Sequence, residues 1–88
     1  MSTTKDSQAT IHKIKIHPKW FGYVDMQQKN AELRKNDRDY RVGDYLLLQE
    51  WDDGYTQNEC LVRITHVLHD YEMKEIRDGF AILSIEKV

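Results

Sequence analysis

Three charged residues, Lys29, Glu32 and Arg34, have types and spacing suited to binding a polar ligand. In an extended strand, side chains two positions apart point to the same face, so Glu32 and Arg34 would share one side, with Lys29 just before them. A carboxylate between two cations stays ionised and holds both in place. The cations then bind phosphate, carboxylate or carbonyl oxygens, and arginine engages two oxygens at once. Spacing alone favours a surface ladder of ion pairs, worth at most about 1 kcal/mol each, over a charged cleft that binds a ligand.

These residues lie in the basic part of an otherwise acidic chain. Five cations and three carboxylates between residues 29 and 41 give a local charge of +2, whereas the whole chain carries −2. A pI of about 6.0 is much lower than that of a typical basic nucleic-acid-binding protein, so affinity for a polyanion must come from this patch. Lys35 and Arg38 flank a turn predicted at Asn36 and Asp37, where they either contact phosphate at the rim or are simply solvated.

Aromatic side chains would supply stacking surfaces if the ligand is a nucleic acid, at about 1–3 kcal/mol for each base. We expect Tyr40 and Tyr71 to take this role. The helical spacing of Trp20 and Phe21 instead favours packing in the core, and packing is also expected for Trp51.

Other kinds of site are disfavoured by the residue types present. The four histidines lack the spacing of a tetrahedral metal site, and the single cysteine, Cys60, excludes an intrachain disulfide. Cys60 falls in an apolar run, so we expect a buried thiol and no catalytic Cys–His arrangement. We therefore expect neither a metal nor a cofactor.

The elements that position these residues must be short, because 88 residues form one domain with a modest core. Hydrophobic patterning predicts a helix over residues 18–28, with Pro18 in its first turn. It predicts strands near residues 11–16, 30–35, 45–51, 59–68 and 80–86. In the second strand Ala31 and Leu33 are expected to face the core, and in the fourth Cys60, Val62 and Ile64 share one face. The order indicates a β-rich α+β fold, a sheet curled into a small barrel with one or two short flanking helices.

The first ten residues are small and polar and lack the apolar segment of a secretion signal, so we expect a disordered tail over 1–10 and the domain over 11–88. No stretch approaches the roughly 20 apolar residues that a membrane span needs. We expect a cytoplasmic monomer with no membrane partner.

Residues 26–34 resemble the Gly-x-Lys-x-x-Glu-x-Arg signature of ASCH domains, a branch of the PUA-like superfamily. Lys29, Glu32 and Arg34 match the signature, and Gln27 stands in place of its glycine. The longer block over residues 32–40, with residues 42–44 and 79–85, is similar to a small branch catalogued as a domain of unknown function. The likeness extends over most of residues 11–86.

The resemblance implies a PUA-like β-barrel with a cleft lined by the motif, and a partner that is RNA or a modified nucleoside. Some compact ASCH relatives are amidohydrolases of acylated nucleosides that use a lysine at the position of Lys29, assisted by a threonine where this chain has Glu32 and by a glutamate from an insertion that this chain lacks. As an enzyme, the chain would use Lys29 and Glu32; Glu32 would favour the charged amine, whereas catalysis requires the neutral one. A binding module using Lys29, Glu32, Arg34, Lys35, Arg38, Tyr40 and Tyr71 is favoured over such a hydrolase. An accessory domain that binds another protein is a further alternative.

Overall fold

The computed structural model describes residues 9–88 as one curled sheet with a short α-helix. The strands are β1 (Ile11–Ile16), β2 (Ala31–Lys35), β3 (Tyr45–Trp51), β4 (Tyr55–His69) and β5 (Phe80–Lys87), with helix α2 (Pro18–Asp25) between β1 and β2 and a 3₁₀ turn η1 (Asp70–Glu72) after β4. The predicted tail lies outside the described residues except for Ala9 and Thr10, and the Thr10 N–H donates to the Asp44 carboxylate at 3.1 Å.

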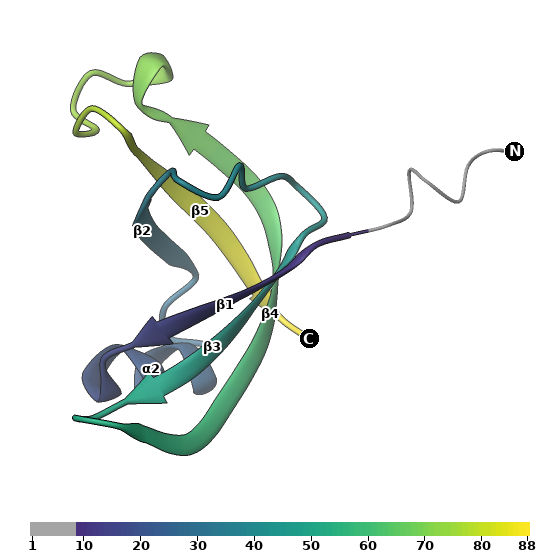
Figure 1. The fold of residues 1–88 in the computed structure, drawn as a ribbon. Coiled ribbons are helices and arrows are strands. Elements are labelled where there is room, and N and C mark those ends of the chain that lie inside the picture. Colours follow the sequence, from purple (N-terminus) through teal and green to yellow (C-terminus); the bar gives the residue numbers. More distant parts are fainter. Residues whose placement is uncertain (1–8) are drawn as a thin grey trace, which may run out of the picture.

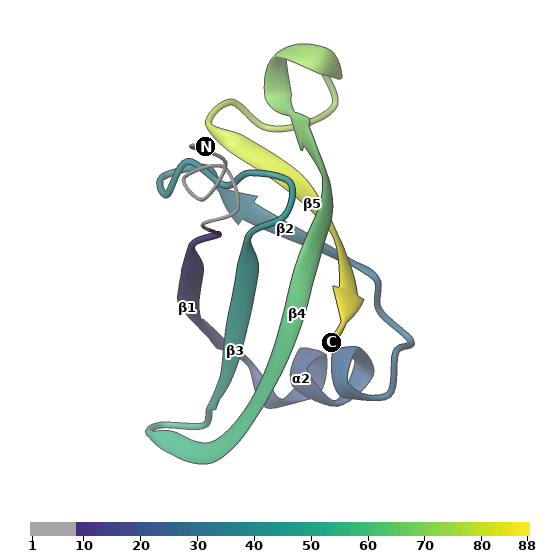
Figure 2. The same ribbon diagram turned by 90° about the vertical axis from the view of Figure 1, so that its right-hand side faces the viewer.

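The five strands are ordered β1-β3-β4-β5-β2, with β1 parallel to β3 and the other pairs antiparallel. The 15-residue strand β4 pairs with β3 along its first half and with β5 along its second, and its register shifts between Ile64 and His66. A bulge of this kind bends a strand and increases its twist. Figures 1 and 2 show the result, a sheet that curves so that β2 and β5 lie across from β1 and β3.

The predicted β-rich α+β class is confirmed. The sheet was predicted to curl into a small barrel, and it forms a half-barrel instead. The edge strands β1 and β2, both within the described part of the chain, do not pair with each other. We call the space between these two edges the seam. Hydrophobic residues on the concave side form the core. Helix α2 and every strand except β2 contribute to it. The predicted inward face of Cys60, Val62 and Ile64 is confirmed, and burial raises the pKa of the Cys60 thiol.

Helix α2 ends earlier than predicted, because Gln27 adopts a positive φ of 61° that an α-helix cannot continue. His17 caps its start by accepting the Lys19 N–H, and Phe21 is buried. The prediction that Trp20 is a core residue was wrong, because its side chain is 45% exposed. Phe21 and Val24, three positions apart, form the buried stripe, and Trp20 lies on the neighbouring helix face.

The two faces of β2 are the reverse of the prediction. Ala31 and Leu33 were expected to face the core, but Leu33 is 58% exposed and Glu32 only 6%. The physical reason is the pairing with β5, in which Glu32 lies opposite Leu83 and Leu33 opposite Ile82. Residues directly opposite in an antiparallel pair share a face, so the inward side chain of Leu83 takes Glu32 to the concave side.

No helix within residues 9–88 is long and apolar enough to cross a membrane.

Candidate ligand-binding site

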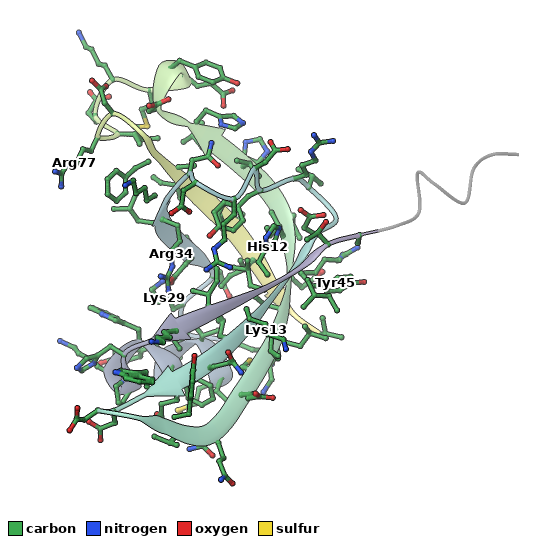
Figure 3. The ribbon with its side chains drawn as sticks, viewed as in Figure 1. His12, Lys13, Lys29, Arg34, Tyr45 and Arg77 are labelled. Atoms are coloured by element: carbon green, nitrogen blue, oxygen red, sulfur yellow. The ribbon has the colours of Figure 1, made fainter. Side chains whose placement is uncertain are left out.

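Glu32 is the centre of an ion cluster on the concave side of β2. Its two carboxylate oxygens contact different cations: Oε1 accepts from Lys29 Nζ, and Oε2 accepts from Arg34 Nε and lies 2.8 Å from Arg34 Nη2. Lys29 Nζ also donates to the Ala31 carbonyl. The structure therefore brings together the three residues that the sequence singled out, and Figure 3 shows Lys29 and Arg34 on the same side of the molecule.

Two arginine side chains bridge the seam. Arg34 Nη2 donates to the Lys15 carbonyl at 2.9 Å, and Arg38 Nη1 donates to the Lys13 carbonyl at 3.1 Å. Both acceptors belong to β1, an edge strand whose outward carbonyls have no neighbouring strand to bond. The arginines thus satisfy main-chain acceptors of β1 and hold two guanidinium groups at the seam.

A hollow of about 350 Å³, which we call the basic hollow, opens at the seam. Its charged lining consists of five cations and one carboxylate: Lys13, Lys15, Arg34, Lys35, Arg38 and Asp37. Ile14, Tyr40 and Tyr55 complete its walls. The Lys15 ammonium lies 3.8 Å from the centroid of the Trp51 ring, which provides a cation–π contact at the rim. A concavity lined mainly by cations concentrates an electrostatic potential that attracts anions.

A second hollow, of about 430 Å³, lies on the other side of Arg34. We call it the indole hollow, and it is lined by Trp20, Lys29, Glu32, Leu33 and Arg34. Its walls combine two exposed apolar side chains with the ion cluster around Glu32. Arg34 lines both hollows, so the two adjoin at that residue.

The two tyrosines expected to stack on bases lie in different surroundings. Tyr40 is only 4% exposed and packs edge-on against His12, with ring centroids 4.8 Å apart, so it presents no open ring face. Burial raises its pKa, despite the opposing effects of Arg38 and Arg34. Tyr71 is 81% exposed and stacks on His69, but it lines neither hollow.

A buried pair positions the loop that carries Arg38. Asp44 Oδ2 lies 3.0 Å from His12 Nε2, and the carboxylate also accepts the N–H groups of Thr10 and Arg41. Burial tends to raise the pKa of Asp44, but these hydrogen bonds outweigh it and hold the pKa below its ordinary value. The pair therefore ties the segment 41–44, which leads into β3, to the start of β1. Within residues 9–88, no group of three or more His, Cys, Asp or Glu side chains is arranged to hold a metal ion.

Lys13, Lys15 and Trp20 are among the lining residues that the sequence pattern did not predict. A signal for the lysines was present, because alternation in β1 places His12, Ile14 and Ile16 inward and leaves both lysines on the other face. Nothing local indicated that this strand would lie across the seam from Arg34. The exposure of Trp20 was obscured by its helical spacing with Phe21.

Comparison with known proteins identifies the family. An uncharacterised 12.9 kDa protein in the GpA 3′ region of Escherichia phage P2 is 47% identical over 60 residues, which cover 67% of this chain and 55% of that protein. The matched segment thus spans little more than half the length of the phage protein. A family model described as "Domain of unknown function (DUF3850)" matches residues 11–85, nearly the whole sheet with its helix. The chain belongs to this DUF3850 family.

Proposed function

We propose that this chain is an ASCH-type module of the PUA-like superfamily that binds RNA or a modified nucleoside in the cleft formed by the basic hollow and the indole hollow. The observation that carries the proposal is a hollow whose lining includes five cationic residues and one carboxylate, with Arg34 and Arg38 bonded to the β1 carbonyls beside it. The half-barrel, with a helix directly before the strand that bears Glu32 and Arg34, is consistent with the fold that the ASCH resemblance implies.

The chemistry of the basic hollow suits a phosphate. Arg34 and Arg38 are oriented by the β1 carbonyls, so their remaining N–H groups are held at the seam, where a phosphate oxygen would accept them. Lys13, Lys15 and Lys35 add charge without fixed geometry. Because the chain as a whole carries −2, attraction to a polyanion is confined to this region.

The test is a titration of fluorescein-labelled single-stranded RNA with the purified protein, followed by anisotropy at several salt concentrations. We expect affinity to fall as the salt concentration rises. The double variant Lys35→Ala with Arg38→Ala should bind more weakly, and its slope of log K against log salt should become shallower by about 0.7 for each lost phosphate contact. A matched control, Arg63→Ala with Lys74→Ala, removes the same charge from residues that line neither hollow. Salt-independent binding, or equal effects of the two double variants, would contradict the proposal.

Amide hydrolysis with Lys29 as the reacting group is the weaker candidate. Lys29 Nζ is already engaged by Glu32 and by the Ala31 carbonyl, an arrangement that holds an ammonium group rather than freeing a nucleophile. Incubation with N-acetylcytidine, with Lys29→Ala as the control, tests this activity directly. Turnover that disappears in the variant would replace the binding proposal with an enzymatic one.

A further inference from the structure

The basic hollow and the indole hollow differ in chemistry although they share Arg34. One is lined by five cations, and the other presents Trp20 and Leu33, which are 45% and 58% exposed. Each volume, about 350 and about 430 Å³, lies at the small end of the range of roughly 300–1,000 Å³ for small-ligand pockets. Two adjoining hollows with a cationic and an apolar lining match a ligand that is itself part anionic and part flat and apolar.

Trp20 supplies the flat apolar surface. Its position on α2, beside the buried stripe of Phe21 and Val24, anchors the helix face while leaving the indole in solvent. Lys19 Nζ lies 5.0 Å from the indole centroid, and Tyr23 tilts against it at 6.2 Å. These two neighbours flank the ring, and an exposed aromatic ring offers a stacking platform for a base.

Glu32 and Lys29 add polar groups beside this platform. The Glu32 carboxylate is 8% exposed and directed at its two cations, and Lys29 keeps a quarter of its side chain in solvent. Lys29 can thus donate to a ring oxygen or nitrogen at the edge of a stacked base. Leu33 is a further lining residue of this hollow.

Arg34 connects the two hollows. Its guanidinium is fixed at one end by Glu32 and at the other by the Lys15 carbonyl, and its side chain remains 27% exposed. A ligand that enters both hollows must pass this group, and a sugar–phosphate link is the part of a nucleotide that bonds an arginine.

From this arrangement we infer that the cleft reads one nucleotide of a single strand in two parts, with the base stacked on Trp20, its phosphate in the basic hollow and Arg34 between them. The inference rests on the proposed function and specifies its ligand as an unpaired nucleotide. A base inside a duplex is stacked on both faces and paired along one edge, so it cannot reach an indole on the protein surface. Single strands are therefore bound and duplexes are not.

The experiment compares three labelled ligands: a short single-stranded RNA, the same RNA annealed to its complement, and an abasic strand with the same number of phosphates. Trp20→Ala should weaken binding of the base-bearing single strand at least about fivefold and leave the abasic strand unchanged. Tyr71→Ala is the control, because Tyr71 is an exposed aromatic residue that lines neither hollow. Thermal unfolding of each variant verifies folding.

A second readout uses the fluorescence of Trp20 itself. The chain has two tryptophans, so Trp51→Phe leaves Trp20 as the single emitter and keeps an aromatic ring beneath Lys15. Addition of single-stranded RNA should quench this emission, and addition of inorganic phosphate should not.

The outcomes separate the two proposals. If the abasic strand binds as tightly as the base-bearing strand, or if Trp20→Ala has no effect, the base site is refuted while phosphate binding in the basic hollow stands. If none of the strands binds with a dependence on salt, the proposed function fails and this inference fails with it. Equal affinity for the duplex also overturns the inference.

Discussion

Glu32 contacts both Lys29 and Arg34 while only 8% of its own side chain is exposed, and the two cations keep about a quarter of theirs in solvent. An ion cluster of this kind gains little net stability, because the cost of removing charges from water offsets most of the attraction. Removing one member is a different matter, since the others then lose their partner. Glu32 therefore acts chiefly to fix the positions of the cations that would meet a ligand.

Glu32→Gln should lower the free energy of unfolding by about 1–3 kcal/mol, less than for a fully buried pair because both cations are partly hydrated. Urea denaturation followed by circular dichroism measures this change. Glu86→Gln is the control, because it breaks an exposed pair with Arg63 and should cost less than about 0.5 kcal/mol. Equal losses in both variants would show that the cluster around Glu32 is no more than a surface feature.

Asp44 makes stability depend on pH in a known direction. Its pKa in the folded chain lies below the ordinary value of 3.8, because hydrogen bonds from His12, Thr10 and Arg41 outweigh the effect of burial. A lowered pKa contributes stability that is present above about pH 3.8 and is lost as pH falls through the folded value. Asp44→Asn should therefore be clearly less stable than the wild type at pH 6, with the gap closing below pH 3.8. Thermal melts from pH 7 to pH 3 measure the gap, and a gap that stays constant would contradict this account.

At the scale of elements, β2 and β1 matter because they are the two edges of one sheet that curls back on itself. Arg34 and Arg38 bond the β1 carbonyls across the seam in place of a ladder of main-chain hydrogen bonds. An open seam leaves room for a hollow that a closed barrel would fill with strand pairing. The basic hollow is therefore a consequence of the sheet stopping short of closure.

The register of β2 against β5 predicts a small loss of stability on truncating Leu33 and a large loss on truncating Leu83. Leu33→Ser should change the free energy of unfolding by less than about 0.5 kcal/mol, because Leu33 is 58% exposed. Leu83→Ala should cost about 2–5 kcal/mol, because Leu83 is fully buried. Chemical denaturation of both variants measures the difference, and a large loss for Leu33→Ser would mean that β2 presents its other face to the core.

For the molecule as a whole, the positions of the charged residues matter more for attraction to an anion than the net charge of the chain. The chain carries −2, yet the basic hollow gathers five cations around a single carboxylate. Charges farther away than the screening length of about 8 Å at physiological salt contribute little at the hollow. The potential at the basic hollow therefore depends on its own lining and not on the net charge of the chain.

Two double variants separate net charge from local charge. Lys13→Ala with Lys15→Ala removes two positive charges from the lining of the basic hollow. We expect the slope of log K against log salt for RNA binding to become shallower by about 0.7 for each lost contact. Glu75→Gln with Asp78→Asn makes the chain less negative at residues that line neither hollow, and we expect affinity to change less than about twofold. Anisotropy titrations measure both, and an affinity that follows net charge in both variants would refute the local account.

Features set by residues close together in the chain could be predicted from the sequence, and features set by distant segments could not. Local patterns sufficed for β3 at residues 45–51 and for the buried face with Cys60, since each depends on neighbours in the chain. The grouping of Lys29, Glu32 and Arg34 was also local, because spacing within one strand decides it. The inward face of β2 and the exposure of Trp20 were predicted wrongly, because each is decided by a partner element.

The sequence by itself determined the β-rich class, the order of elements and the ion cluster around Glu32, because alternation and spacing act over a few residues. The face of β2 that turns inward was set by its pairing with β5. Alternation divides the residues of a strand between two faces, but it does not say which face meets the core; the register with the neighbouring strand does. The long-range fold also brings the main-chain carbonyls of Lys13 and Lys15 within hydrogen-bond reach of Arg38 and Arg34 across the seam. That meeting depends on the curl of the whole sheet, which no single segment specifies.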